Sequence, residues 1–384
     1  MESFLSSKKL GLWVFNGTSG VLVLEDGSVY WGRGFGAEGR VVGEVVFNTG
    51  MVGYCEALTD PSYYGQILVL TYPLVGNYGV PEYIEDEWGL ARWFESWGIK
   101  ACGLVVHEAC SKPSHWSSAR TLDEWLRSEG VPGLEHVDTR ALTRRLREKG
   151  TMLGVLEVSS SGHSISELKA ILARAEMPDS RNLVEHVTVR EPAVYGSGPR
   201  VVLVDCGVKH SIVRCLLKRS FQVVRVPYSY SASEILELKP EGVVFSNGPG
   251  DPSKLMHTAT TLRELADEGL PVLGICLGNQ LLALAYGGST YKLRYGHRSQ
   301  NQPCVDLRTG RCYVTSQNHG YAVDPRSLPP ELEVWFKNAN DETVEGLWGL
   351  EGRVLGTQFH PEASPGPLDC SFVFDMFARR VLHA

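Results

Sequence analysis

Gly274-Ile275-Cys276-Leu277-Gly278-Asn279-Gln280 decides the fold, because it joins a buried strand to a helix at a reactive side chain. The apolar run Pro271-Val272-Leu273 precedes it, and a helical pattern over 281–286 follows. The thiol of Cys276 then lies at a sharp bend, and small residues are needed two positions to each side because a side chain there would collide with the turn. The pattern is a G-x-nucleophile-x-G elbow with sulfur in place of the hydroxyl group. The amino end of the following helix favours the thiolate, the reactive form of cysteine. For an isolated pattern of this kind, a buried structural cysteine is the alternative.

The composition indicates a globular protein of two domains. With 384 residues the chain exceeds one ordinary core. A content of 43% hydrophobic and 21% charged residues is typical of soluble proteins. The net charge of −7 argues against binding to nucleic acid. No apolar stretch approaches the roughly 20 residues that a membrane span needs, so no membrane association is expected.

The amino terminus and the cysteines predict the compartment. Met1–Lys9 lacks the apolar core of a secretory signal. The nine cysteines are scattered, and no pair has C-x-x-C spacing, which argues against both a zinc site and a disulfide framework. We therefore expect a cytoplasmic protein without a metal site.

Residues 1–190 are predicted to form an α+β domain. A hairpin is indicated where two apolar runs, 21–24 and 29–31, flank a turn sequence. Further strands are expected at 41–47, 67–72 and 103–106. Helix signals, two of them with the spacing of a capping box, predict helices at 85–97, 121–130, 138–150 and 164–175.

A linker is predicted at residues 191–199, where proline and glycine cluster without an apolar period. Residues 200–384 then alternate short apolar runs with helical patterns. Strands that are apolar on both faces, alternating with helices, indicate a doubly wound, mostly parallel sheet. The whole chain is therefore predicted to be α/β, with a site outside the carboxyl ends of the second domain's strands, where Cys276 lies.

A base and an orienting group for the thiol follow another predicted strand, residues 354–359. That strand ends in His360-Pro361-Glu362. Residues two apart in an extended segment project to the same side, so Glu362 can hold one nitrogen of His360 and leave the other for sulfur. His319 is a rival base, but its neighbours include no carboxylate at a comparable spacing. We therefore predict a triad of Cys276, His360 and Glu362.

A third strand end carries the loop Asn247-Gly248-Pro249-Gly250-Asp251-Pro252. Its two glycines expose backbone amides that could stabilise an oxyanion together with the amide of Leu277. An ordinary cluster of β-turns is the alternative for this loop taken alone. A further polar patch, residues 317–321, precedes another apolar pair.

These motifs together resemble a triad-type glutamine amidotransferase domain. The amino-terminal half narrows the resemblance to the small, glutamine-hydrolysing subunit of carbamoyl-phosphate synthetase. The segments that carry it are 47–54, 58–63, 71–73, 76–79 and 138–143. The resemblance covers nearly the whole chain in the expected order.

The resemblance implies a role for each site residue. Cys276 would attack the side-chain amide of L-glutamine to form a glutamyl thioester, His360 would carry the proton to the leaving ammonia, and Glu362 would orient His360. The amides of Gly250 and Leu277 match the oxyanion hole of the family. The remaining matched positions would hold the glutamine: Gly50, Gly248, Gln280, Asn318, Gly320 and Tyr321.

Two positions depart from the family pattern. Gly50 stands where members often have a serine whose hydroxyl group contacts glutamine, so a modest loss of affinity is expected. Asn279 stands where a histidine is usual. We expect catalysis to survive that change, while the coupling of hydrolysis to the partner is altered.

The resemblance also implies a partner. In the family the ammonia passes through a tunnel to a large subunit, which makes carbamoyl phosphate from bicarbonate and ATP for arginine and pyrimidine biosynthesis. This chain has no G-x-x-x-x-G-K-[ST] sequence and no convincing dinucleotide fingerprint. We therefore expect no cofactor in this chain, with ATP and Mg²⁺ on the large subunit.

Three other functions are possible interpretations of the same motifs. The chain could be the glutaminase subunit of a different synthetase, such as one making anthranilate or guanylate, but residues 1–190 argue against that. It could be a catalytically dead docking subunit, which the intact Cys276, His360 and Glu362 argue against. It could also be a cysteine peptidase or γ-glutamyl hydrolase, which would act on peptides or polyglutamates rather than on free glutamine.

Overall fold

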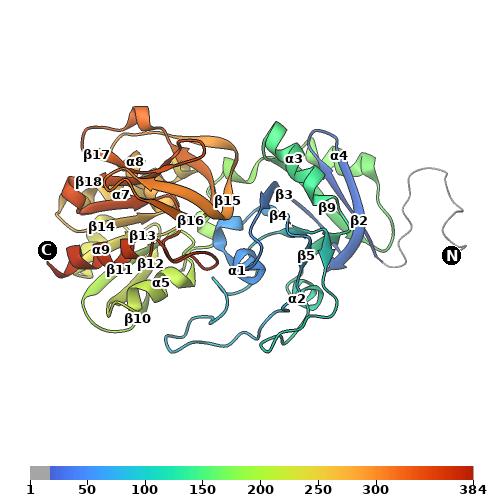
Figure 1. Ribbon diagram of the computed structural model, residues 1–384, viewed down its shortest axis with the longest axis horizontal. Helices are drawn as coiled ribbons and strands as arrows, with labels where there is room; N and C mark the ends of the chain where they lie inside the picture. The colour runs from blue at the N-terminus through green and yellow to red at the C-terminus, as the bar shows by residue number, and fades with distance from the viewer. Residues whose placement is uncertain (1–17, 384) are drawn as a thin grey trace, which may run out of the picture.

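The computed structural model describes residues 18–383 and places an amino-terminal and a carboxy-terminal body side by side along its longest axis (Figure 1). Helix α1 (Tyr54–Thr59) lies near the middle of this view (Figure 1). The first 17 residues of the predicted first domain, including the stretch examined for a secretory signal, lie outside the described residues.

The first body is built on a closed barrel. Strand β1 closes it by pairing with both β2 and β9 in antiparallel fashion. Around the barrel the order is β1 (Ser19–Leu24), β2 (Val29–Gly36), β8 (Pro132–Glu135), β6 (Gly103–Val105), β4 (Gln66–Leu70), β3 (Gly39–Asn48) and β9 (Met152–Ser159). The short strands β5 (Leu74–Val75) and β7 (Glu108–Ala109) pair separately. The predicted hairpin and the three further strands are confirmed, and closure of the sheet is the feature that local patterns missed.

Alternation along β1 explains how helices cover the barrel strands. Leu22 and Leu24 pack in one cluster with Leu142 and Leu146 of α3 (Thr139–Lys149). The intervening valines, Val21 and Val23, pack in another cluster with α4 (Ile165–Leu172). Side chains two apart share a face of a strand, so β1 contributes to both layers.

The amino-terminal helices begin where their caps predict, with one exception. The capping box of Thr121 and Glu124 opens α2 (Leu122–Ser128), and the side chain of Asp138 caps α3. Ser164 caps α4 through the amide of Glu167.

The predicted helix at 85–97 is wrong. Residues 86–91 form a tight turn instead, with a bridge between Glu85 and Ala91. The carboxylate of Asp86 accepts hydrogen bonds from the amides of Trp88 and Leu90, which competes with helical pairing. Gly89 has a φ of 76°, a left-handed conformation that ends any helix.

The second body is organised around a ten-stranded sheet. Its order is β10 (Ala193–Tyr195), β12 (Gln222–Pro227), β11 (Arg200–Asp205), β13 (Gly242–Phe245), β14 (Val272–Ile275), β19 (Val354–Thr357), β18 (Val344–Gly349), β17 (Leu332–Asn338), β15 (Thr290–Asp306) and β16 (Cys312–Val323). The run from β12 to β19 is parallel, with crossover connections. Its carboxyl ends therefore meet at one edge.

The expectation of a mostly parallel sheet is wrong, because β10 and the four strands beyond β19 pair in antiparallel fashion. Within the described chain, residues 288–353 contain strands and short 3-10 turns but no α-helix. Parallel neighbours need a long crossover, usually a helix, so this segment returns through hairpins instead. The second body is a mixed sheet with a parallel centre.

Helices cover both faces of the parallel centre, as predicted for a doubly wound arrangement. On one face Val202 and Val204 of β11 pack with α6 (Ala232–Glu237), α7 (Met256–Asp267) and α8 (Leu277–Ala285). On the other, Val201 and Leu203 pack with α5 (His210–Leu217) and α9 (Phe372–Leu382). Burial on both faces explains why these strands are continuously apolar.

The segment predicted as a linker, 191–199, contains strand β10. Its residues pair in antiparallel fashion with β12 at the edge of the sheet, so part of the segment belongs to the second body. Proline and glycine marked its irregular flanks, but three residues suffice for an edge strand.

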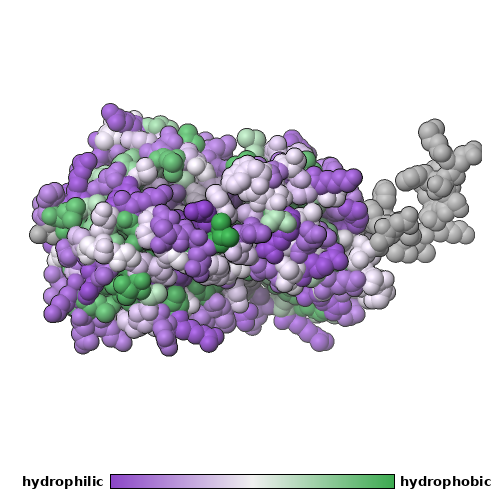
Figure 2. Space-filling model, turned by 90° about the horizontal axis from the view of Figure 1, so that it is seen from below, coloured by the Kyte–Doolittle hydropathy of each residue, from purple (hydrophilic) through white to green (hydrophobic). Residues whose placement is uncertain are grey.

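The surface agrees with a folded protein whose apolar side chains are mainly inside. The face seen in Figure 2 is largely hydrophilic, with hydrophobic residues in small separate groups. All nine cysteines are free thiols. No helix within residues 18–383 combines the length and the apolar character that crossing a membrane requires.

Glu95 joins the two bodies. This carboxylate is only 1% exposed and comes from the irregular segment before β6. It accepts hydrogen bonds from the amide and the hydroxyl group of Ser211 in α5, at 3.1 and 2.6 Å, and from the hydroxyl group of Ser364 at 2.6 Å. A residue of the first body therefore holds the start of α5 and the loop after β19.

Replacing Glu95 by alanine is predicted to destabilise the protein. Three donors on Ser211 and Ser364, two of them buried, would lose a charged acceptor, so the free energy of unfolding should fall by about 2–4 kcal/mol. Urea unfolding measures the change. The matched control is Glu264→Ala on the exposed side of α7, which should stay within about 0.5 kcal/mol of the wild type. Equal stabilities of the two variants would contradict the role of Glu95.

Candidate active site

Cys276 occupies the bend between β14 and α8, as the elbow pattern predicts. Its φ of 55° and ψ of −101° are far from both strand and helix values. A Cβ atom on Gly274 would lie 2.4 Å from the carbonyl oxygen of Gly278, and one on Gly278 would lie 2.1 Å from that of Phe245. Both small residues are therefore required by backbone contacts. A strained residue held by its surroundings in this way is typical of a functional site.

The thiol of Cys276 is buried and has two polar neighbours. Its Sγ lies 3.6 Å from the carbonyl oxygen of Asn318, and the side-chain amide of Gln358 donates to it at 3.6 Å. The residue is 2% exposed. The amide of Leu277 is the first in α8, among the donors that no earlier turn can satisfy.

His360 and Glu362 form the predicted imidazole–carboxylate pair. Nδ1 of His360 lies 2.6 Å from Oε1 of Glu362, and both side chains are buried. The other nitrogen, Nε2, is buried without a hydrogen-bond partner among the described residues. Burial alone would lower the pKa of His360, but the charge of Glu362, aided by the neighbouring Cys276, raises it to about 10. The geometry fixes the ring and leaves one nitrogen for the thiol.

Lys209 is a site residue that the sequence analysis missed. Its Nζ donates to Oε1 of Glu362 at 3.0 Å and to the carbonyl oxygen of Ala363 at 2.6 Å. Burial would raise the pKa of Glu362, but Lys209 and then His360 outweigh it and lower that pKa to about 2. Burial likewise opposes the charge of Lys209, while Glu362 and other carboxylates raise its pKa above the usual value. Lys209 lies just after β11, so the rule of strand ends that located Cys276 could have found it.

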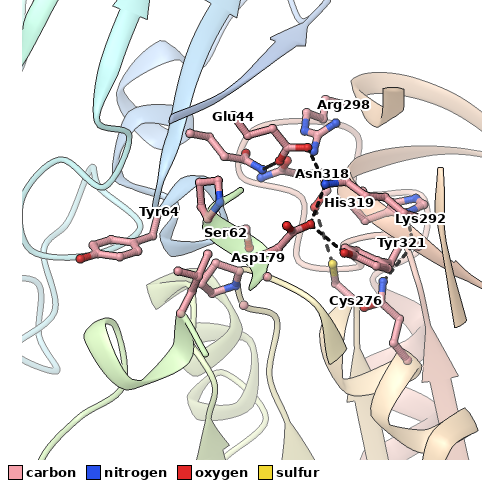
Figure 3. A pocket seen from close by; sticks show the side chains of 18 residues that line it. Glu44, Ser62, Tyr64, Asp179, Cys276, Lys292, Arg298, Asn318, His319 and Tyr321 are labelled. Atoms are coloured by element: carbon pink, nitrogen blue, oxygen red, sulfur yellow. Dashed lines mark hydrogen bonds and ion pairs between the residues drawn. The ribbon is translucent and has the colours of Figure 1, made fainter. Parts of the chain in front are cut away.

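A pocket opens beside the thiol (Figure 3). It brings together most of the predicted glutamine-binding residues with Cys276: Gly248, Gly250, Gln280, Asn318, Gly320 and Tyr321. Gln280 donates to the carbonyl oxygen of Tyr321 at 2.9 Å and to Gln358 at 3.1 Å. Leu277, His360 and Glu362 are not among its lining residues.

The first body contributes to this pocket. Asp60 accepts a hydrogen bond from the side chain of Asn318 at 2.8 Å, and Ser62 accepts one from Asn247 at 3.0 Å. Both come from the segment around the 3-10 helix η1 (Pro61–Tyr63). In the sequence analysis these residues served only as part of the family resemblance, and no site role was predicted for them. Nothing in their local sequence shows that they contact the other body.

An ion-pair cluster lies at the pocket between the two bodies. The ammonium group of Lys292 in β15 lies 2.9 Å from Oε1 of Glu44 and 2.6 Å from Oδ2 of Asp179. The hydroxyl group of Tyr321 donates to the same oxygen of Asp179 at 2.7 Å. Figure 3 shows these side chains meeting near Cys276.

His319, the rival base, also lines the pocket, but both of its ring nitrogens are engaged by groups other than the thiol. Its Nδ1 lies 2.8 Å from the carbonyl oxygen of Tyr321 and its Nε2 lies 3.2 Å from Oε1 of Gln317. Burial, and then the charge of His297, lower the pKa of His319 well below its usual value. No hydrogen bond joins His319 to Cys276 within the described chain, so His360 remains the better candidate.

His297, His319 and Glu345 are close enough to be considered as metal ligands, with ligand atoms within 4.8 Å of one another. The same atoms already take part in hydrogen bonds. The imidazole of His297 lies 2.8 Å from Asp341 and 3.2 Å from Glu345. Burial would lower the pKa of His297, but these two carboxylates raise it to about 9. The cluster is a buried ion-pair network behind the pocket.

The two positions that depart from the family pattern lie apart from the thiol's pocket. Gly50 lines a second recess with Asn48 and Met51, and a Cβ atom there would lie 2.5 Å from the side-chain amide of Gln300. Asn279 is fully buried inside α8 and donates weakly to Gln358 at 3.5 Å. Gln358 in turn donates to Cys276, so this side chain links Asn279 to the thiol.

Comparison with known proteins places this architecture first in a class and then in a family. Residues 202–380 match the family described as glutamine amidotransferase class-I. Residues 22–156 match the family described as carbamoyl-phosphate synthase small chain, CPSase domain.

Full-length relatives agree with both matches. The carbamoyl phosphate synthase small chain of Sulfolobus acidocaldarius is 46% identical over 96% of this chain and 98% of its own. That of Pyrococcus furiosus is 49% identical over 94% of this chain and 97% of its own. The multifunctional protein CAD of Squalus acanthias is 48% identical over 93% of this chain, which corresponds to 16% of that protein. The chain belongs to the carbamoyl-phosphate synthase small-chain family, whose members supply ammonia from glutamine.

Replacing Gly278 by alanine is predicted to disrupt the elbow. The new Cβ atom would meet the backbone oxygen of Phe245 at 2.1 Å, and a backbone atom cannot move aside cheaply. The free energy of unfolding should fall by more than about 3 kcal/mol. Gly287→Ala is the control: its φ is 83° and no atom lies within 4 Å of the added Cβ, so about 1–2 kcal/mol is expected. Thermal unfolding measures the stability of both variants. A smaller loss of stability in Gly278→Ala than in Gly287→Ala would contradict the elbow geometry.

The contribution of His360 to stability is predicted to depend on pH. Its pKa in the folded protein, about 10, exceeds its usual value, so its stabilising effect is full below about pH 6.5 and is lost as the pH rises through 10. The low pKa of Glu362 adds stability above about pH 4.5 that is lost as the pH falls through 2.

The difference in the free energy of unfolding between wild type and His360→Asn should therefore be largest near pH 6 and shrink toward pH 10. Urea titrations at pH 6, 8 and 10 measure it. His383→Asn, beyond the end of α9, gives the background for an exposed histidine. A difference that stays constant from pH 6 to 10 would contradict the buried ion pair.

Proposed function

We propose that Cys276, His360 and Glu362 carry out the glutamine hydrolysis that family membership assigns to the chain. The observation that supports this most is the juxtaposition at one sheet edge of a strained, buried thiol and an imidazole held by a buried carboxylate. These are the parts that nucleophilic catalysis by cysteine needs. An intact set of parts also argues against a docking subunit without activity.

The reaction proceeds through a thioester. Because its pKa is raised to about 10, His360 already carries a proton on Nε2 at neutral pH, and the sulfur of Cys276 attacks the side-chain carbonyl carbon of glutamine as the thiolate. The tetrahedral intermediate collapses as His360 gives this proton to the amide nitrogen, and ammonia leaves. Water then attacks the thioester with His360 as the base, which releases glutamate and restores the thiolate. Lys209 and Glu362 hold the ring of His360 in place throughout.

Two backbone amides form the oxyanion hole in this proposal. The amide of Leu277 begins α8 beside the nucleophile, and Gly250 lies on the facing loop of the pocket. Donors fixed in the backbone need no reorganisation when negative charge develops on the carbonyl oxygen. The φ of Gly250 is 91°, a conformation that favours glycine at that position.

The substrate is held by residues that line the pocket: Gly248, Gln280, Asn318, Gly320 and Tyr321. Gly50 is proposed to contribute through its backbone only, because it has no side chain and faces the neighbouring recess.

The ammonia is proposed to pass to a large chain that makes carbamoyl phosphate, with ATP and Mg²⁺ bound there and none in this chain. The support is the name of the full-length relatives, which are small chains. A relative from Chaetomium globosum, 44% identical over 95% of this chain, is an arginine-specific small chain. We propose arginine and pyrimidine biosynthesis as the uses of the product.

Replacing Cys276 by serine tests the proposal. The hydroxyl group is a much weaker nucleophile at this position, so glutamate release from glutamine should fall by more than about 1,000-fold. The assay follows glutamate with and without the large chain. Cys312→Ser, an exposed thiol in β16, is the control and should retain wild-type activity. Unchanged hydrolysis by Cys276→Ser would show that the nucleophile lies elsewhere.

A further inference from the structure

The charged side chains that line the pocket beside Cys276 balance in number but are paired unevenly. Four of them are Glu44, Asp179, Lys292 and Arg298. Lys292 pairs with both carboxylates, at 2.9 and 2.6 Å. Both carboxylates are therefore held by Lys292, and neither is paired with Arg298.

Arg298 is buried and has no anionic partner among the described residues. The residue, in β15, is 5% exposed. Its one side-chain hydrogen bond runs from Nη1 to the carbonyl oxygen of Tyr295 at 2.8 Å, and Nε is buried and unpaired. Within residues 18–383 its guanidinium group forms no ion pair. Buried arginines are nearly always paired, because an uncompensated charge away from water is costly.

The guanidinium group lies against the strand proposed to hold the substrate. A Cβ atom on Gly320 would be 3.2 Å from Nη2 of Arg298, so the absence of a side chain there leaves this nitrogen uncovered. Asn318, the partner of Arg298 in the register of β15 and β16, places its carbonyl oxygen 3.6 Å from the thiol. Figure 3 shows Arg298 beside Asn318 at the pocket that holds Cys276.

We infer that Arg298 binds the α-carboxylate of glutamine. The guanidinium group has five donors in a planar fork that fits a carboxylate, and four of its five hydrogens make no hydrogen bond within the described part of the chain. Glutamine brings one carboxylate into the pocket, and Arg298 is the lining cation that no carboxylate of the described residues pairs with. Binding of the substrate supplies the missing partner of Arg298.

This role concerns recognition rather than chemistry. Arg298 is fixed by Tyr295 on one side and faces Gly320 on the other, so the carboxylate end of glutamine is held while the amide end points to Cys276. The inference rests on the proposed function, since it takes the pocket beside Cys276 as the glutamine site. Arg298 lies on the antiparallel hairpin of β15 and β16, so neither the elbow pattern nor the rule of strand ends could identify it from the sequence.

The test compares two substrates in the full chain with its large chain. L-glutamine carries the α-carboxylate, whereas L-glutaminamide has an uncharged carboxamide there and keeps the same reacting amide. Ammonia release gives kcat and KM for wild type, Arg298→Met, Arg298→Lys and the control Arg311→Met, an exposed arginine before β16.

The inference predicts that Arg298→Met lowers kcat/KM for glutamine by about 10- to 100-fold, mainly through KM. Its kcat/KM for glutaminamide should stay within about 2-fold of the wild-type value. Arg298→Lys should recover part of the loss for glutamine only, because it keeps the charge but not the fork. Arg311→Met should match the wild type with both substrates.

Several results would overturn the inference. Equal losses for both substrates in Arg298→Met would assign the residue a structural role, and no loss for glutamine would remove it from the site. If Arg298→Met fails to fold, the wild type decides the question. Its kcat/KM for glutamine must exceed its kcat/KM for glutaminamide by at least about 10-fold, and a smaller preference overturns the inference. A wild type that releases no ammonia from glutamine would instead contradict the proposed function itself.

Discussion

The buried chain of charges from Lys209 through Glu362 to His360 is the interaction on which the site depends. All three side chains are nearly inaccessible to water, so each charge needs its neighbour. Glu362 accepts from Lys209 at 3.0 Å and lies 2.6 Å from His360. Lys209 follows β11 and the other two follow β19, on either side of the elbow that carries Cys276. The parallel centre of the sheet is what brings these segments together, and the helices on its faces keep that edge rigid.

The first body completes this site rather than merely accompanying it. Asp60 holds the side chain of Asn318, and Glu44 with Asp179 engages Lys292 across the boundary. Glu95 ties the start of α5 to the loop that follows Glu362. The pocket beside Cys276 is therefore built from both bodies. A change in how the two bodies meet would reach the pocket beside Cys276 through these contacts.

Sequence patterns predicted the parts that local rules govern. The elbow, the capped helices at Thr121 and Asp138, and the pairing of His360 with Glu362 each follow from neighbours within a few residues. The features that the sequence analysis missed depend mainly on segments that lie far apart in the sequence. Barrel closure needs β1 to find β9, and the antiparallel half of the sheet arises because no helix separates β15 to β18. Arg298 could not be identified from the sequence, because its burial and its lack of an ion pair among the described residues are properties of the fold. At 85–97, hydrogen bonds to Asp86 form a turn in place of the predicted helix.

The most direct measurement of the central claim is identification of the covalent intermediate. The full chain is mixed with glutamine, quenched in acid during steady turnover, and digested for mass spectrometry. The account predicts a glutamyl thioester on the peptide that contains Cys276 and on no other cysteine peptide, and its disappearance once glutamine is exhausted. A glutamyl group on a different cysteine, or continued hydrolysis while the Cys276 peptide stays unmodified, would contradict the account.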